Sequence, residues 1–327
     1  MTKNVVSLSD AQKGAQFTSV DVKTLPVFKE TDYTKIDDKC REQLVLLLRN
    51  VAIPALPEGC FFENSYSGIL ATDLFSLNTL LGSMIENRVV FFLNTHRNLW
   101  DKEGEWSCYH FIRSNESFPD VRLVRKTDNQ DVKLGIELKS WFILSKEGDP
   151  SFRYCTASSA CDPGDLLCIV PWYLSDAVCG HPVLLTPWVY SAKAASEATK
   201  RYWLYERETT KAMTLEQRSL IEPANLTPYM LNARDNTNYS PNDDKGNNFG
   251  RLARTGIMTK FVEDTLQTEI LGIPADNWRR FLQAHTDSSA LKDVRKKIDR
   301  IMQIPNSEEF EKLKQSLMDY LDLLPRT

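Results

Sequence analysis

The sequence predicts an α/β protein, with a sheet-containing core followed by a helical C-terminal region, and three observations predict it. In VKLGIELKSWFIL, residues 132–144, apolar and polar side chains alternate, as in a strand with one face on a core. The segment DLLCIVPWYL, residues 165–174, is a continuous apolar run that suits a fully buried strand. Beyond residue 255, the segments look helical one after another.

The other elements of the core are expected in the following order. Residues 1–30 look irregular, and Asp32 or Thr34 is expected to cap the first helix, which ends before two prolines. Helices are expected over about 32–50, 76–95 and 191–208, and strands over 106–113 and 120–125.

A change of composition marks the start of the C-terminal region. Residues 225–250 are rich in Asn, Asp, Gly and Pro and predict a long loop. The helical segments that follow cover 256–271, 274–284, 289–304 and 306–324. We therefore divide the chain into an N-terminal extension with a helix (1–60), a core (61–215), and a loop plus helical region (216–327) expected to serve specificity or dimerisation.

Composition limits the class of protein. Hydrophobic residues make up 42% and charged residues 26% of the chain, which is ordinary for a soluble globular protein. The longest apolar runs are far too short to span a bilayer, and the first residues lack a hydrophobic signal segment, so we expect a cytoplasmic protein without a membrane partner. Seven cysteines without paired spacing and only four histidines argue against a disulfide framework and against zinc.

Three side chains carry the expected chemistry: Asp120, Glu137 and Lys139. The first two offer oxygen ligands for a hard divalent cation, and the third offers an ammonium group. Phosphodiester hydrolysis needs such a set, because a metal gathers the phosphate and polarises water while a cation supports the attacking water. An acidic residue two positions before a lysine is common by itself, since four other such pairs occur in the chain.

The local context distinguishes Glu137 and Lys139 from those pairs. The alternation places Lys133, Gly135, Glu137 and Lys139 on the strand face opposite the core, so the carboxylate and the ammonium project together. Gly135 is expected to leave open space for a phosphate or an ion. Asp120 belongs to the only Pro-Asp of the chain, Pro119-Asp120, and a hairpin would bring it near the middle or end of the second strand. The alternative is a solvated surface pair, with Pro-Asp only opening a strand or turn.

The segments FPD and GIELKSWFILSKEGDPSFRY together resemble the PD-(D/E)xK nucleases, and specifically the type II restriction endonucleases and their relatives. The likeness covers about residues 65–210. It implies a restriction-endonuclease-like core, a central mixed sheet flanked by helices in the order helix, three antiparallel strands, helix, strand. It further implies that Asp120 and Glu137 bind Mg2+, helped by the backbone carbonyl of Leu138, and that Lys139 orients or deprotonates the attacking water.

Family members often add a carboxylate from the helix before the sheet, and Glu86 is the candidate here. Glu86 points roughly away from the main apolar stripe of segment 76–95, as a solvated residue would. The second half of that helix is apolar nearly all round, however, so a neighbouring Glu could face a cleft. Glu86 is therefore either a ligand for a second metal ion or a solvated helix residue.

Further candidates for DNA contacts lie in two loops: Ser151, Arg153, Asn247, Asn248, Arg251 and Arg254. The first loop could approach the scissile phosphate, although Gly-Asp-Pro first indicates a turn. The second loop has side chains of the types that bind base edges, although a flexible connector is the simpler interpretation. The net charge of −4 lends DNA binding no support, but it does not exclude a basic cleft on an acidic protein.

The function expected from the sequence is Mg2+-dependent hydrolysis of double-stranded DNA by a sequence-specific type II restriction enzyme. The resemblance implies a bacterial homodimer whose two-fold axis matches a palindromic site, with a cognate DNA methyltransferase as functional partner. Two alternatives are a nuclease of the same family in phage defence or repair, and a DNA- or protein-binding module that keeps the fold without catalysis. The glycine-rich nucleotide-binding motifs and the G-x-S-x-G elbow do not occur.

Overall fold

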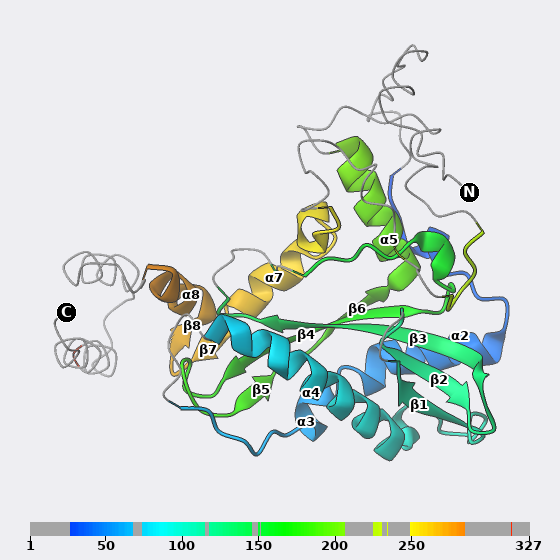
Figure 1. Cartoon of the computed structure of the whole chain (residues 1–327), viewed down its shortest axis with the longest axis horizontal. Coiled ribbons are helices and arrows are strands. Elements are labelled where there is room, and N and C mark those ends of the chain that lie inside the picture. Colours follow the sequence, from blue (N-terminus) through cyan, green and yellow to red (C-terminus); the bar gives the residue numbers. More distant parts are fainter. Residues whose placement is uncertain are drawn as a thin grey trace, which may run out of the picture.

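A mixed sheet with helices on both faces forms the centre of the molecule (Figure 1). The structure, a computed structural model, describes residues 27–67, 74–114, 118–145, 150, 152–206, 225–230, 234, 249–284 and 315. The six strands of the sheet are β1 (Tyr109–Arg113), β2 (Val121–Arg125), β3 (Asp128–Phe142), β4 (Leu166–Leu174), β5 (Pro182–Leu184) and β6 (Trp188–Ser191). The main helices are α2 (Lys39–Leu47), α3 (Leu56–Gly59), α4 (Leu74–Thr95), α5 (Ala192–Arg201), α7 (Thr259–Leu266) and α8 (Ala275–Ala284). The α/β class predicted from the sequence is confirmed.

The sheet combines antiparallel and parallel pairs. Strands β1, β2 and β3 form an antiparallel meander, and β3 then pairs with β4 in parallel. Strands β5 and β6 both pair antiparallel with β4, β5 near its end and β6 near its start. The strands expected over 106–113, 120–125, 132–144 and 165–174 are all present. The mixed sheet flanked by helices, as implied by the resemblance, is therefore also found.

The order of the helices differs from the expected one. Between β3 and β4 the described residues contain only a short 3-10 turn, η5 (Ser158–Ala160), where a helix was expected. Apart from two alanines, the segment TASSACDPGD, residues 156–165, contains only residues with low helix propensity, including Pro and Gly, which disfavours a longer helix there. The large helix α5 instead follows β6, and it contacts β4 and β6.

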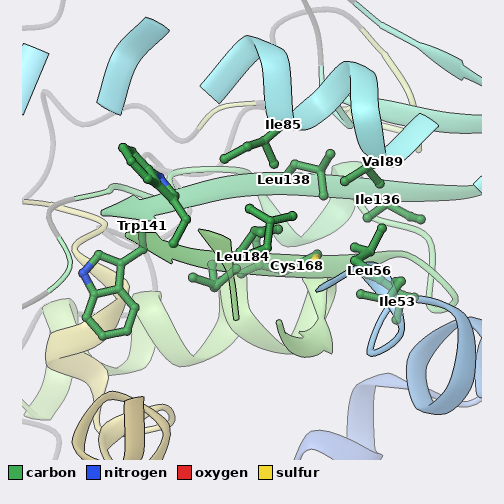
Figure 2. Close-up of a cluster of buried hydrophobic side chains, with 14 of the residues drawn as sticks. Ile53, Leu56, Ile85, Val89, Ile136, Leu138, Trp141, Cys168 and Leu184 are labelled. Carbon is green, nitrogen blue, oxygen red and sulfur yellow. The ribbon is translucent and has the colours of Figure 1, made fainter. Parts of the chain in front are cut away.

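Helix α4 covers one face of the sheet. Ile85 and Val89 of α4 point toward Leu138 and Ile136 of β3, and all four side chains are buried (Figure 2). Their spacing, four residues apart on the helix and two apart on the strand, matches the periods of the two elements. Helix α3 joins the same layer and contacts α4 and β5.

The opposite face of the sheet is covered by α5 and α7 (Figures 1 and 2). On β3 this is the face of Glu137, Lys139 and Trp141, and the ring of Trp141 lies 6.1 Å from that of Phe261 in α7. Strand β3 therefore has protein on both faces. The alternation of apolar and polar residues in β3 indicates which face is apolar. It does not indicate whether the polar face is exposed to solvent.

Two predicted helix boundaries were wrong. Asp32 and Thr34 do not cap the first helix, because residues Glu30–Tyr33 form a separate 3-10 turn, η2. Helix α2 starts after Asp38 instead, whose side chain accepts hydrogen bonds from the backbone N–H groups of Cys40 and Arg41. All three candidates are residue types that cap helices, so composition alone could not choose between them.

The second wrong boundary lies in the segment 256–271, which is not one helix. Helix α7 ends at Leu266, and two short strands, β7 (Glu269–Ile270) and β8 (Ile273–Pro274), precede α8. Leu271 and Gly272 turn between these strands with φ values of 53° and 75°, a conformation that ends the helical pattern. The predicted helix at 274–284 is present, whereas the two after it lie outside the described residues except for Gln315, which is helical.

Side chains from segments before and after the sheet join its strands in the main hydrophobic core, while Trp203, Leu204, Tyr205 and Phe249 form a second, smaller cluster. Leu48 and Ile53, before the sheet, and Leu252 and Trp278, after it, belong to the same buried cluster as the strands. In those parts of the chain that the structure describes, no helix has the length and apolar character needed to cross a bilayer.

Asp165, just before β4, ties three segments together. Its Oδ1 accepts hydrogen bonds from Gly135 N of β3 at 2.7 Å and from the Tyr229 hydroxyl at 2.8 Å, and its Oδ2 accepts one from Asp162 N at 2.8 Å. The side chain is fully buried, and this burial raises its pKa to about 7.

Replacing Asp165 by Asn is expected to remove a pH-dependent part of the stability. The folded pKa of about 7 lies above the ordinary value of about 4, so between these values the folded protein holds a proton that the unfolded chain releases. The contribution of Asp165 to the free energy of unfolding is therefore present at low pH and lost as the pH rises toward 7, by about 1.4 kcal/mol for each pH unit at most.

Urea unfolding of the wild type and of Asp165→Asn at pH 5, 6, 7 and 8 measures this effect. The wild type should lose stability relative to the variant over that range. Asp131→Asn is the matched control, because the hydrogen bonds from Lys133 and Arg125 lower the pKa of Asp131, so its titration lies below this range. A difference between wild type and Asp165→Asn that does not change with pH would contradict the prediction.

Candidate active site

The pairing of β2 with β3 brings Asp120 to Glu137. Val121 of β2 pairs with Ile136 of β3, so Asp120 lies one step further, beside Glu137. The Oδ2 atom of Asp120 accepts a hydrogen bond from the backbone N–H of Leu138 at 2.8 Å. The hairpin expected from the sequence is confirmed, and it places the first strand's head against the middle of the second.

Lys139 completes the cluster. Its Nζ lies 2.5 Å from Glu137 Oε1 and 3.5 Å from Asp120 Oδ2. Glu137 and Lys139 share a strand face, as the alternation predicted, because they are two residues apart on β3. The structure thus brings together all three side chains in which the sequence placed the chemistry.

The burial of the cluster changes its electrostatics. Glu137 is only 8% exposed, and burial raises the pKa of its carboxyl, with Lys139 acting in the opposite direction. Burial by itself would lower the pKa of Lys139, but the two nearby carboxylates outweigh it, so the pKa of Lys139 is raised. Lys139 thus contacts two carboxyl groups at once, those of Glu137 and Asp120.

The same cluster has free oxygen ligands. Glu137 Oε2 is buried and has no hydrogen-bond partner among the described residues, and the Oδ1 atom of Asp120 has none there either. The backbone N–H of Leu138 donates to Asp120. In a strand, the N–H and C=O of one residue point to the same edge, so the carbonyl of Leu138 also points to the edge where Asp120 lies. An unpartnered buried carboxylate oxygen is costly unless a cation takes it.

These ligands fit a hard divalent cation such as Mg2+. Mg2+ prefers oxygen ligands and is usually held by one or two carboxylates while it keeps several waters. Asp120, Glu137 and the Leu138 carbonyl would supply such a partial shell. Within the described residues no group of three or more His, Cys, Asp or Glu side chains is close enough together to hold a metal ion.

A pocket of about 270 Å³ opens next to the cluster, between α4 and the part of β3 that β2 no longer covers. Its lining residues come from α4, β3 and the segment after β3: Gly82, Ser83, Ile85, Glu86, Leu138, Lys139, Ser140 and Phe152. The predicted residues Glu86, Leu138 and Lys139 therefore border one and the same space.

Glu86 reaches this pocket but is paired with a cation. Its Oε2 atom accepts a hydrogen bond from Arg113 Nε at 2.8 Å, and Arg113 Nη2 lies 2.6 Å from the same oxygen in an ion pair. Sequence reasoning missed Arg113, although it is the last residue of the strand predicted over 106–113. The pairing joins β1 to α4, and no pattern within either segment indicates it.

The expectation of open space beside Gly135 was wrong. A Cβ atom at Gly135 would lie 2.3 Å from Pro119 Cγ and 3.0 Å from Asp165 Oδ1. The missing side chain therefore makes room for Pro119, the residue before Asp120, and not for a ligand. Gly135 supports the site indirectly, by letting the Pro119-Asp120 segment lie close against β3.

The two loops that hold the candidate DNA contacts lie next to each other where the structure describes them. Arg153 and Arg251 form an isolated antiparallel bridge, and Tyr154 N donates to Gly250 O at 2.8 Å. Arg153 and Arg254 are exposed, and Arg153 follows Phe152 of the pocket wall. Ser151, Asn247 and Asn248 lie outside the described residues.

Comparison of the chain with protein-family models, with curated proteins and with solved structures finds no match in any of the three. The comparisons therefore assign neither a family nor an activity. The chemistry and position of the three clustered side chains are the basis for a function.

Gly135→Ala is expected to destabilise the protein and to disturb the site. The new methyl group would collide with the ring of Pro119, and such overpacking costs about 1–3 kcal/mol of the free energy of unfolding. Gly82→Ala is the matched control, because a Cβ there meets only Ser140 Oγ at 3.4 Å and alanine favours the helix. Urea unfolding of both variants tests this, and equal stability of Gly135→Ala and wild type would contradict it.

Proposed function

We propose that the protein is a Mg2+-dependent endonuclease that hydrolyses phosphodiester bonds of double-stranded DNA. The observation that carries this proposal is the cluster of Asp120, Glu137 and Lys139 beside an open pocket, with a buried carboxylate oxygen that lacks a partner among the described residues. Two hard oxygen ligands and an ammonium within hydrogen-bond reach of one of them are the set that metal-assisted hydrolysis of a phosphodiester requires.

Each residue of the cluster would have a separate role in the proposed reaction. Asp120, Glu137 and the Leu138 carbonyl would hold Mg2+, which, when bound, polarises the phosphate and lowers the pKa of a coordinated water. Lys139, fixed between the two carboxylates, would orient the attacking water through its ammonium group. The Leu138 N–H fixes Asp120, and the strand fixes Glu137 and Lys139, so the site needs little rearrangement to act.

The family that best accounts for this arrangement is that of the PD-(D/E)xK nucleases. Its support is the motif from Pro119 to Lys139, together with a helix, an antiparallel meander of three strands and a parallel fourth strand in this order. The position of α5 after β6 departs from the implied order, so the family assignment depends mainly on the site.

The resemblance extends the proposal to a sequence-specific type II restriction enzyme. Such an enzyme would act as a homodimer on a palindromic site in the bacterial cytoplasm, with a cognate DNA methyltransferase as its partner. The bridged Arg153 and Arg251, with Arg254 nearby in η8 (Leu252–Thr255), would contact the DNA backbone beside the pocket.

Loss of Lys139 should abolish most of the proposed cleavage activity. On unmethylated phage DNA the wild type should cleave with Mg2+ and not with EDTA, and Lys139→Ala should slow cleavage by about 10²–10⁴-fold. Lys133→Ala is the matched control, since Lys133 stands in an acid-x-Lys pair on the same strand but binds Asp131 away from the site, and it should cleave normally.

Sequencing of the DNA ends separates the outcomes. Discrete fragments would support a restriction enzyme, whereas smearing lost in Lys139→Ala would keep the nuclease and remove the restriction claim. If modified and unmodified duplexes, single strands and RNA all stay intact, the nuclease proposal fails and a binding module without catalysis is favoured.

Loss of Arg153 should weaken the proposed binding to DNA. Arg153→Ala should weaken binding to all duplex sequences alike, and it should reduce the slope of log K against log salt concentration by about 0.9, the value for one lost phosphate contact. Arg125→Ala, at the opposite end of β2 from Asp120, should leave the slope unchanged. Binding measured by fluorescence anisotropy in EDTA tests this, and an unchanged slope for Arg153→Ala would contradict it.

A further inference from the structure

The ion pair between Arg113 and Glu86 lies at the pocket and has no role in the chemistry described so far. The hydrogen bond from Arg113 Nε and the ion-pair contact of its Nη2 both end on one oxygen, Glu86 Oε2. The two side chains are 32% and 21% exposed, so they border on solvent and are not sealed in the core. Glu86 is one of the residues that line the pocket, so the ion pair joins β1 to α4 at the border of that pocket.

Strand pairing fixes Arg113 next to the cluster. Arg113 pairs with Val121, the residue after Asp120, and Ser114 N donates to Asp120 O at 2.7 Å. Ile136 projects toward α4 (Figure 2). Paired residues share a face, so Val121 and Arg113 project to the same side of the sheet. Arg113 therefore approaches the pocket from the α4 side, while Lys139 projects from the other face of the sheet.

The guanidinium group of Arg113 has N–H donors that are not used in hydrogen bonds to the described residues. Of its five N–H donors, the one on Nε is used in a hydrogen bond to Glu86 among the described residues, and Nη2 lies within ion-pair distance of the same oxygen. A planar guanidinium suits the non-bridging oxygens of a phosphate, because its parallel N–H groups match two oxygens at once. The carboxylate of Glu86 would fix the orientation of the Arg113 guanidinium group before the substrate binds.

The same geometry argues against Glu86 as a metal ligand. Glu86 is not part of any metal-binding group with Asp120 and Glu137 in the described structure, and its neighbour is a cation. A metal ion at Glu86 would have to displace or repel Arg113. A metal and a guanidinium thus compete for one carboxylate, and the contacts favour the guanidinium.

We propose that Arg113 is the second cationic group on the substrate phosphate, that Glu86 positions it, and that the centre works with one Mg2+ per chain. This inference rests on the proposed nuclease function. Negative charge grows on the non-bridging oxygens as water attacks a phosphodiester, and fixed donors aimed at those oxygens stabilise that state. Asp120 and Glu137 would place one cation on the phosphate, and Arg113 would supply the other.

Metal binding tests the number of ions without depending on catalysis. Mn2+ titrated into the protein alone, and followed by its paramagnetic resonance signal, should bind as one ion per chain in the wild type and in Glu86→Gln. Binding should be lost in Glu137→Gln. Two ions per chain in the wild type, with one lost in Glu86→Gln, would overturn the inference.

Cleavage of phage DNA under single-turnover conditions tests the role of Arg113. Arg113→Met keeps the apolar stem, removes the fork and should slow the maximal rate by about 10²–10³-fold, the usual effect of losing one donor to a developing oxyanion. Arg113→Lys, which restores the charge but not the fork, should recover part of this loss. Glu86→Gln should slow cleavage less than Arg113→Met and leave the Mg2+ concentration for half-maximal rate unchanged.

The outcomes separate this inference from the proposed function. If the wild type cleaves, Lys139→Ala does not, and Arg113→Met cleaves at the wild-type rate, only the role of Arg113 is wrong. If Glu86→Gln shifts the Mg2+ dependence tenfold or more, Glu86 is a metal ligand and the inference fails. If the wild type shows no Mg2+-dependent cleavage, the proposed function and this inference fall together.

Discussion

The register between β2 and β3 is the constraint on which the site depends. Val121 and Ile136 pair with each other, and both are fully buried beneath α4. A slip of one residue would turn Ile136 to the other face and expose the apolar row of β3 to polar neighbours, so packing against α4 holds the register. The same register sets Asp120 beside Glu137 and its carboxylate on Leu138 N. The position of the chemical groups is thus a consequence of how the apolar face packs.

The electrostatic state of the cluster follows from its burial. Charged carboxylates are costly to bury, and Lys139 offsets part of that cost for both Glu137 and Asp120. Lys139 contacts both carboxyl groups but leaves Glu137 Oε2 without a partner among the described residues, and this buried oxygen is what makes a divalent cation a suitable addition. The net charge of the whole chain carries no information about this, because the relevant charges lie within a few residues of each other on paired strands.

The sequence predicted those parts of the site that depend on short-range patterns. The period of two identified β3 and the shared face of Glu137 and Lys139, and Pro-Asp before a strand identified Asp120. The close approach of Pro119 to Gly135 and the pairing of Glu86 with Arg113 were not predictable, because they join segments that only the folded chain brings together. The break after α7 escaped notice for a similar reason. Ile270 follows Leu266 at helical spacing, so the sequence pattern continues beyond the end of α7 and does not show that Glu269–Ile270 pairs as a strand with Ile273–Pro274.

The middle of β3 changes partners, and this explains why a site forms there. Up to Ile136 the strand pairs with β2, and from Ile136 onward it pairs with β4, so each half has one edge without a neighbouring strand. Side chains take the backbone groups on these edges: Asp165 accepts from Gly135 N on one side, and Asp120 accepts from Leu138 N on the other. Unpaired edge groups normally need such cover. Asp120 is therefore oriented by the gap that the end of β2 leaves, and that gap also opens the pocket lined by Leu138, Lys139 and Ser140.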